Sequence, residues 1–310
     1  KGLHQNCCVV FGGVNQAGQV KSLRQGADVL VATPGRLNDL VNQGYIDLSQ
    51  VEIFVLDEAD RMLDMGFIHD VKRVISQLPQ KRQNLMFSAT LPKEIRTLVA
   101  GILQNPVKIS ITPPATTVER IDQSVYYVDK SNKCRLLVWV LKDPRISSAL
   151  VFTRTKHGAD RVVRDLTHAN ISAAAIHGDK TQNARQAALS KFRNHQVRVL
   201  VATDIAARGI DIEEISHVIN YDIPEVPETY VHRIGRTARA GHSGTALSFC
   251  SINEKANFQH IQRLIRQEIP EIKEHPYPMR ELVPMTKEEQ RQKQLERQKD
   301  AKAAREPVPA

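Results

Sequence analysis

Short apolar runs alternate with longer mixed stretches along most of the chain. A short apolar run between turn residues predicts a buried strand, and apolar residues at helical spacing predict a helix. In the first part of the chain the predicted strands are Cys7–Phe11, Val29–Ala32, Ile53–Leu56 and Asn84–Phe87, and the predicted helices are Asp70–Gln77 and Pro92–Leu103.

A second series of strands and helices follows a segment rich in proline and threonine. That segment, Pro106–Val118, lacks apolar periodicity and predicts a linker that continues to about Ile121. The predicted strands beyond it are Ser124–Val128, Leu150–Phe152, Ala173–Ile176, Val197–Ala202, His217–Tyr221 and Thr245–Cys250. The predicted helices are Lys133–Leu141, His157–Ala169, Gln182–Phe192 and Glu254–Arg266.

Strands that alternate with helices predict an α/β fold with a doubly wound parallel sheet in each part. We expect the domain boundaries 1–108, 109–121 for the linker, 122–275 and 276–310 for a polar tail. From Glu281 onward the tail carries seven basic and six acidic side chains, so it contributes only 7 − 6 = +1 to the charge. It is typical of a frayed helix or a disordered extension.

Composition narrows the class of protein only slightly. With 310 residues, 41% hydrophobic and 25% charged, the chain is typical of a globular protein with two domains. No apolar run approaches membrane-spanning length. The net charge of +9 suits a polyanionic partner, although many proteins without one are equally basic. The cysteines lack metal-ligand spacing and predict buried free thiols in a reducing, cytoplasmic location: Cys7, Cys8, Cys134 and Cys250.

Two adjacent carboxylates, Asp57 and Glu58, follow the predicted strand Ile53–Leu56. Ligands of open α/β sheets bind at this edge. Enzymes that hydrolyse nucleotides need one acid there to hold Mg²⁺, directly or through water, and a second to orient the attacking water. Asp57 and Glu58 suit these roles in that order; the alternative is an ordinary acidic turn.

A phosphate-binding loop of the form G-x-x-x-x-G-K-[ST] does not occur in the sequence. The segment Gly13–Val20 has the glycine spacing, but Gln19 and Val20 replace the lysine and the hydroxyl residue. We interpret this segment as a connection between a strand and a helix. Because the chain also begins at Lys1 without an initiator methionine, we expect it to be an N-terminally truncated piece of a longer protein.

Several further motifs appear in order along the chain. They are Gly12-Gly13, Thr33-Pro34-Gly35-Arg36, Asp57-Glu58-Ala59-Asp60, Ser88-Ala89-Thr90, Val151–Thr155, His177-Gly178-Asp179 with Gln182 and Arg185, Ala202–Asp211 and His232–Arg239. Together they resemble the DEAD-box RNA helicases of superfamily 2, from about Phe11 to about Arg266, with the bacterial RhlE-type subgroup as the nearest. The resemblance implies two tandem RecA-like domains, the first one incomplete here.

The resemblance also implies roles in catalysis. It makes Arg236 and Arg239 arginine fingers, for which the alternative is a pair of surface arginines. Gly209 and Asp211 resemble the positions that approach the ribose of ATP. The residues implied to couple ATP hydrolysis to RNA are Asp60, Ser88, Thr90, Gln182, Arg185, Arg208 and His232. Gln182 and Arg185 are ambiguous between RNA contact and interdomain bridging, and His232 is equally compatible with a structural role.

RNA contacts are implied for small, polar or backbone-exposing residues: Gly12, Gly13, Thr33, Gly35, Arg36, Thr153, Arg154, Gly178, Asp179 and Thr203. Such residues grip phosphates and 2′-hydroxyls and do not read bases. Aromatic residues make up 5% of the chain and no stacking platform is apparent, so binding is expected to be independent of RNA sequence.

Three functions are therefore compared. The first is an ATP- and Mg²⁺-dependent RNA helicase or RNP remodeller, acting on single strands or short duplexes, with ribosomal or RNA-decay assemblies as further partners. The second is an RNA-binding module without ATP turnover. The third, a DNA-directed helicase, is disfavoured by the combination of the DEAD, Ser88-Ala89-Thr90 and His232–Arg236 motifs. An RNA-binding role for the tail remains an alternative to a frayed helix.

Overall fold

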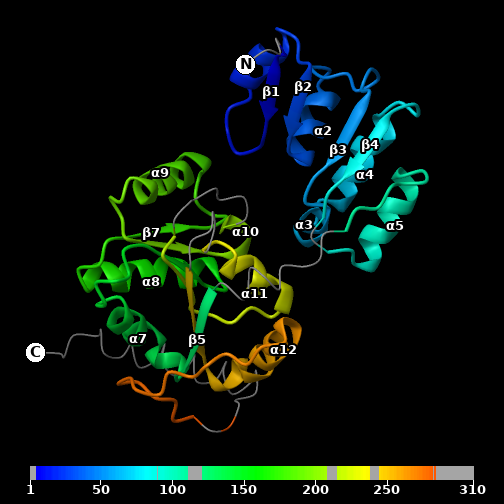
Figure 1. The fold of residues 1–310 in the computed structure, drawn as a ribbon. Coiled ribbons are helices and arrows are strands. Elements are labelled where there is room, and N and C mark those ends of the chain that lie inside the picture. Colours follow the sequence, from blue (N-terminus) through cyan, green and yellow to red (C-terminus); the bar gives the residue numbers. More distant parts are fainter. Residues whose placement is uncertain are drawn as a thin grey trace, which may run out of the picture. The chain divides into compact units, whose positions relative to one another are not determined.

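The computed structural model describes residues 5–88, 90–110, 121–207, 215–237, 244–281 and 283. The chain divides into two units, unit 1 (Lys1–Ile111) and unit 2 (Thr112–Ala310), each built of strands and helices (Figure 1). The doubly wound parallel α/β prediction is confirmed for unit 2, and the described strands of unit 1 are likewise parallel.

Unit 1 contains two parallel strand pairs. β1 (Cys7–Val10) pairs with β2 (Val29–Ala32), and β3 (Ile53–Leu56) pairs with β4 (Gln83–Met86). The helices of the unit are α1 (Ala17–Leu23), α2 (Pro34–Asn42), α3 (Ala59–Asp64), α4 (Ile68–Gln77) and α5 (Lys93–Ile102). Leu30, Ala32 and Phe54 pack into one hydrophobic cluster with Leu37 and Val74, so the two strand pairs share a core.

In the described part of unit 1, the strands are covered on one face only. Side chains that point to the other face stay open to solvent, with exposed fractions of 43–57%: Val9, Val29, Val31, Ile53 and Val55. Parallel sheets normally bury both faces. Among the described residues, unit 1 therefore carries an uncovered apolar sheet face, defined here by those five side chains.

Unit 2 is built on a six-stranded parallel sheet of order β5-β10-β9-β6-β8-β7. The strands are β5 (Ile121–Tyr127), β6 (Ala149–Phe152), β7 (Ala173–Ile176), β8 (Val199–Ala202), β9 (His217–Asn220) and β10 (Gly244–Cys250). The central strands β6 and β8 are buried at every position, as expected when helices cover both faces.

Two groups of helices sandwich this sheet. α7 (Lys133–Val140) and α8 (Lys156–His168) pack on the face that carries Ala149 and Val151. The opposite face is covered by α9 (Gln182–Arg193), α10 (Asp204–Ala207), α11 (Pro227–Ile234) and α12 (Lys255–Ile265). Short 3₁₀ turns, η1 (Lys130–Asn132) and η2 (Ile252–Glu254), precede α7 and α12.

The outer edge of β5 is covered by the chain that follows α12. The N–H of Val125 donates to the carbonyl of Pro270 (2.9 Å), and the N–H of Met279 donates to the carbonyl of Tyr127 (3.1 Å). The N–H groups of Arg280 and Glu281 then both donate to Oδ1 of Asp129, at 2.9 and 3.0 Å. Residues 276–281, expected to begin a polar tail, thus lie against unit 2 and close an edge that would otherwise present unpaired backbone groups.

Most predicted strands and helices are confirmed to within three residues. One correction concerns Ile121, expected to end the linker, which is instead the first residue of β5 and is buried. Asp122 and Gln123 interrupt its apolar pattern, which hides the start of the strand. A second concerns Cys7 and Cys134: Cys7 is exposed and Cys134 is only partly buried, whereas Cys8 and Cys250 are buried as expected.

Candidate functional site

The acidic turn after β3 places both carboxylates at the carboxyl end of the strand. Asp57 and Glu58 are exposed, and Oδ1 of Asp57 accepts the N–H of Glu58 at 2.8 Å. Glu58 has left-handed backbone angles (φ 49°, ψ 48°), unusual for a residue with a side chain, and its carboxylate forms an ion pair with Arg61. The N–H of Ala59 donates to the carbonyl of Phe87 (3.1 Å), which fixes the turn beside the end of β4.

Asp60 links this turn to the Ser88–Thr90 segment. Its Oδ2 accepts both the hydroxyl and the N–H of Thr90, each at 2.8 Å. The hydroxyl of Ser88 accepts the N–H of Asp60 (3.1 Å) and donates to the carbonyl of Thr90 (2.7 Å). Burial alone would raise the pKa of Asp60, but the hydrogen bonds with Thr90 and Ser88 outweigh it and lower the pKa.

The acidic turn suits Mg²⁺ only together with a phosphate ligand. Among the described residues no group of three His, Cys, Asp or Glu side chains could hold a metal ion. Magnesium, however, is commonly held by one or two carboxylates plus substrate phosphates and water. Asp57, exposed at the strand end, is the carboxylate that fits this role, because Glu58 is engaged by Arg61.

The loops that carry the predicted RNA contacts of unit 1 lie together at one sheet edge. The N–H of Thr33, after β2, donates to the carbonyl of Val10, at the end of β1 (3.0 Å). Gly12, Gly13, Thr33 and Gly35 are all exposed. A Cβ built on Gly12 or Gly35 would meet no atom within 4 Å, so folding of unit 1 does not require glycine at either position.

Arg36, predicted to contact RNA, points into unit 1. Its Nη1 donates to Oε1 of Gln19 and its Nη2 to the carbonyl of Val14, both at 3.1 Å, and only 12% of its side chain is exposed. Gln19 in turn donates to the carbonyl of Phe11 (3.0 Å). In this structure the guanidinium of Arg36 therefore braces the loop that carries Gly12 and Gly13.

The corresponding edge of unit 2 gathers the loops after β6, β7 and β8. Gly178 and Asp179 are exposed there, and Asp179 forms an ion pair with Lys156 at 2.7 Å. Hydrogen bonding to that ammonium lowers the pKa of Asp179. Thr203 is half-buried at the end of β8, where its N–H donates to the carbonyl of Ile176 (3.3 Å).

The two candidates after β6 differ in accessibility. Thr153 is fully buried and its hydroxyl donates to the carbonyl of Thr155 (3.3 Å), so its side chain is not presented to RNA in this structure. Arg154 is 44% exposed, and its Nη2 lies 3.4 Å from Oε1 of Glu254.

On α9, the predicted residues Gln182 and Arg185 contact each other: Nη1 of Arg185 donates to Oε1 of Gln182 (3.3 Å).

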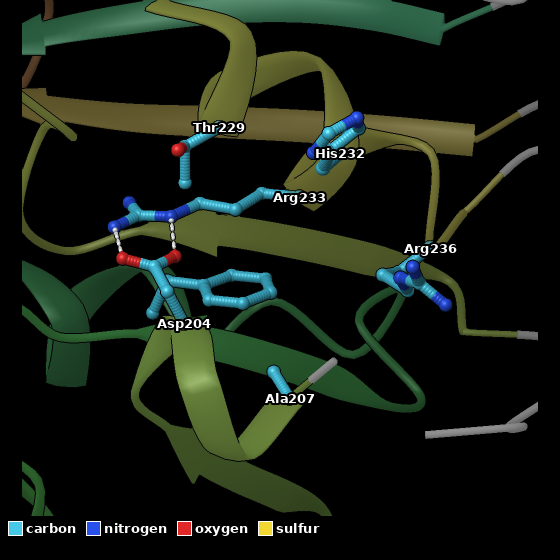
Figure 2. Close-up of a pocket in the computed structure, with 7 residues that line it drawn as sticks. Asp204, Ala207, Thr229, His232, Arg233 and Arg236 are labelled. Carbon is cyan, nitrogen blue, oxygen red and sulfur yellow. Dashed lines mark hydrogen bonds and ion pairs between the residues drawn. The ribbon is translucent and has the colours of Figure 1, made fainter. Parts of the chain in front are cut away.

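Arg233 anchors the last motif inside unit 2. Its Nε and Nη2 bond both carboxylate oxygens of Asp204, at 2.6 and 2.8 Å (Figure 2). Its Nη1 donates to Oδ1 of Asn220 (3.2 Å) and to the carbonyl of Asp222 (2.6 Å). The guanidinium also lies over the ring of Phe152, 5.0 Å from its centroid, a cation–π geometry.

Arg236 lies in a turn two residues beyond the end of α11. Figure 2 shows its side chain and that of His232 on the rim of a small pocket, apart from the ion pair of Arg233 with Asp204. The buried hydroxyl of Thr237, which donates to the carbonyl of Ile215 (2.6 Å), fixes the chain directly after Arg236. The predicted residues Arg208, Gly209, Asp211 and Arg239 lie outside the described residues.

Asp204 is a site residue that the sequence pattern did not single out. It follows β8 closely, much as Asp57 follows β3. An acidic residue at the carboxyl end of a buried strand is the pattern by which Asp204 could have been predicted.

No helix in the described part of the chain is long and apolar enough to cross a membrane.

Comparisons with known protein families agree with this geometry. Residues 1–98 match the family described as DEAD/DEAH box helicase, and residues 132–241 match the helicase conserved C-terminal domain. The ATP-dependent RNA helicase CshA of Limosilactobacillus reuteri is 43% identical over 271 residues. That alignment covers 86% of this chain and 54% of CshA, so the chain spans about half the length of this relative.

Solved structures show the same fold. Dbp5 L327V of S. cerevisiae, bound to RNA and ADP BeF3, is 31% identical with a TM-score of 0.76, and the match covers 87% of this chain and 70% of that one. The E. coli DEAD-box protein SrmB, bound to regulator of ribonuclease activity A, is 36% identical with a TM-score of 0.51, covering 54% of this chain and 98% of that one. The expectation of RecA-like α/β domains is thus confirmed, and the chain belongs to the DEAD-box RNA helicases.

Proposed function

We propose that the chain is the larger part of an ATP-dependent RNA helicase or RNP remodeller that separates short RNA duplexes when ATP closes its two units on RNA. The observation that carries this proposal is the buried Asp60, whose carboxylate joins the acidic turn to Thr90. Residues suited to nucleotide hydrolysis are thereby tied to the segment expected to couple hydrolysis to RNA.

The catalytic roles follow from the placement of the acids and arginines. Asp57 would hold Mg²⁺, directly or through water, and the bound ion would neutralise charge on the β- and γ-phosphates. Glu58 orients the attacking water once it leaves Arg61. Arg236 and Arg239 stabilise the charge on the transferred phosphoryl group, and Gly209 and Asp211 contact the ribose of ATP.

Coupling and RNA binding use the two sheet edges. Gly12, Gly13, Thr33 and Gly35 in unit 1 hold the RNA backbone. In unit 2 the same task falls to Arg154, Gly178, Asp179 and Thr203, whereas Thr153 and Arg36 support their loops. Gln182, Arg185, Arg208 and His232 transmit the ATP state to these contacts. Because the contacts are to backbone, binding is independent of sequence.

Within the family, we place the chain near the bacterial RhlE-type subgroup on the general similarity of its motifs. The bacterial source of the CshA relative is compatible with this placement. We propose a cytoplasmic location and a role on ribosomal or RNA-decay assemblies.

A second candidate function is an RNA-binding module without ATP turnover. The observation that favours it is the sequence Gly13–Val20, where Gln19 and Val20 stand in place of the lysine and hydroxyl of a phosphate loop. No segment of the 310 residues carries the complete motif.

An unwinding assay separates these functions. Residues 1–310 are tested alone and joined behind the phosphate-loop segment of a relative such as CshA. The joined protein should separate a short RNA duplex in the presence of ATP and leave the matching DNA duplex intact, and Glu58→Gln should abolish this. RNA binding by both proteins without any ATP-driven separation would favour the second function, and equal activity on DNA would contradict an RNA-directed enzyme.

A further inference from the structure

Unit 1 contains a pocket that no catalytic or RNA-contact role accounts for. It lies between α1 and the end of α2, and its lining combines two cations, an aromatic ring and two amides: Asn15, Gln16, Ala17, Val20, Lys21, Arg24 and Tyr45.

The rim of this pocket is held by hydrogen bonds. The side-chain amides of Gln16 and Gln43 bond each other in both directions, at 2.8 and 3.3 Å, and join the start of α1 to the end of α2. Gly44 then turns the chain with φ 75°, a conformation that favours glycine. The N–H of Tyr45 donates to the carbonyl of Leu40 (2.9 Å), which leaves the side chain of Tyr45 41% exposed on the pocket.

The charge of the pocket is positive and uncompensated. Lys21 and Arg24 are exposed, and within the described ranges neither has a carboxylate at ion-pair distance. The nearby acid Asp39 is engaged by Gln43 (2.8 Å) and lies 3.7 Å from Arg36. An exposed aromatic ring flanked by two such cations is the combination that binds single-stranded nucleic acid, because the ring stacks on a base and the cations meet phosphates.

The pocket continues the predicted RNA edge of unit 1. The loop 11–16 contains Gly12 and Gly13, is bonded to Arg36 at Val14, and ends in the pocket at Gln16. α2 likewise begins directly after Thr33 and ends three residues before Tyr45. Its nine residues span about 13 Å at 1.5 Å each. A strand that leaves the edge along this loop therefore reaches the pocket within a few nucleotides.

We propose that this pocket is an additional RNA subsite, in which a nucleotide flanking the main contacts stacks its base on Tyr45 while Lys21 and Arg24 hold adjacent phosphates. The proposal rests on the RNA-binding function above. It adds a stacking platform where the sequence offered no sign of one, and it makes affinity depend on the length of the strand.

The test is an anisotropy titration of the 310-residue chain with single-stranded oligouridylates of increasing length. The variants are Tyr45→Ala, Tyr45→Phe and the double variant Lys21→Gln/Arg24→Gln. The control is Lys72→Gln/Arg73→Gln, which removes the same two kinds of charge from the exposed face of α4. Thermal unfolding of each variant shows whether unit 1 remains folded.

For long strands, Tyr45→Ala should weaken binding about tenfold and Tyr45→Phe should stay within about twofold of the parent. The Lys21/Arg24 double variant should reduce the slope of log K against log salt by about 1.4, since single strands lose about 0.7 per phosphate contact. All of these effects should disappear for strands too short to reach the pocket.

If the parent binds RNA but the pocket variants match the control at every length, the subsite is refuted and the RNA-binding function stands. The subsite is likewise refuted if the pocket variants lose affinity for a protein partner only. If the parent binds no RNA at any length, both proposals fail together.

Discussion

The residues that precede and follow Arg236 in the sequence are fixed in place by hydrogen bonds within unit 2. Arg233, three positions before it, is 2% exposed and donates to Asp204, Asn220 and the carbonyl of Asp222. Thr237, directly after it, is bonded to the carbonyl of Ile215. The position of the Arg236 backbone is therefore set by the fold of unit 2 before any nucleotide binds, which is what an electrostatic role in catalysis requires.

Replacing Arg236 by alanine in a version with a phosphate loop should lower kcat for ATP hydrolysis by about 10³-fold, by analogy with other arginine fingers. ATP affinity should change much less, because the acidic turn lies in unit 1. Steady-state kinetics with saturating RNA measures both.

Two further substitutions sharpen this measurement. Arg236→Lys should not restore activity, since an ammonium cannot reproduce the planar fork of a guanidinium. Arg263→Ala, which removes an exposed arginine from α12, should leave kcat unchanged. Hydrolysis by Arg236→Ala within a few-fold of the parent would show that Arg236 is structural.

The lowered pKa of Asp60 predicts an acid sensitivity of unit 1. A carboxyl whose pKa falls on folding contributes stability that is complete above its ordinary pKa of 3.8 and is lost as the pH falls through the lowered value. Asp60→Asn should therefore destabilise unit 1 at neutral pH, and its difference from the parent should shrink in acid. Urea unfolding as a function of pH measures this, with Thr90→Val expected to show an intermediate effect. Parallel curves for parent and Asp60→Asn would exclude the mechanism.

A buried ion pair joins helix α7 to turn η2, and its lysine also bonds the chain directly after β9. Nζ of Lys133, 1% exposed, lies 2.7 Å from Oε2 of Glu254 and 2.6 Å from the carbonyl of Tyr221. Glu254 also accepts the N–H and hydroxyl of Ser251 and the N–H of Ile223. One carboxylate thus ties together three segments far apart in the sequence.

Glu254→Gln should lower the free energy of unfolding of unit 2 by up to about 3 kcal/mol, because it leaves the buried Lys133 ammonium with only the more distant Asp222, at 3.5 Å, as a counter-ion. In a double-mutant cycle, Lys133→Met combined with Glu254→Gln should cost less than the sum of the two single changes. Urea denaturation measures the cycle. Arg145→Gln, which breaks an exposed pair with Asp143, should have little effect. Additive costs for Lys133 and Glu254 would show that the pair is not coupled.

Strands were predictable from the sequence wherever burial on both faces produced a continuous apolar run, as at Leu150–Phe152. Helices were predictable where their apolar face was periodic. α2 and α11 were missed, although each has proline at its first position, because motif residues that look like loops occupy the first turn of α2 and the last turn of α11. The spacing of apolar residues indicates which residues of a helix face the core. It gives no indication of a helix end that faces the functional site.

The candidate site was predictable at the level of which loops meet, since parallel strands end at one edge. Which way a side chain turns was not. Arg36 and Thr153 bear guanidinium and hydroxyl groups suited to RNA, yet the fold uses them as internal braces. The burial of Lys133 could not be predicted from the sequence, because its ion-pair partner Glu254 lies 121 positions away.

The chain taken as one enzyme should hydrolyse ATP negligibly, even with saturating RNA. Its two units carry the acids and the arginine, but residues 1–310 include no lysine and hydroxyl pair in a phosphate loop to position the β- and γ-phosphates. A phosphate-release assay on the 310-residue chain, with Glu58→Gln as the control, measures this. RNA-stimulated release that Glu58→Gln abolishes would contradict it and show that another segment holds the phosphates.

The uncovered apolar sheet face of unit 1 has a consequence for how the chain behaves on a chromatography column. Five valine and isoleucine side chains, each about half exposed, form a hydrophobic surface that can bind an alkyl resin. Sulfate strengthens this binding, because it is excluded from protein surfaces. The chain should elute late on a hydrophobic-interaction column. Val31→Thr together with Val55→Thr should bring elution forward, although neither residue touches ATP or RNA in the proposed mechanism. Hydrophobic-interaction chromatography would then separate variants by their exposed apolar surface, which activity assays do not measure.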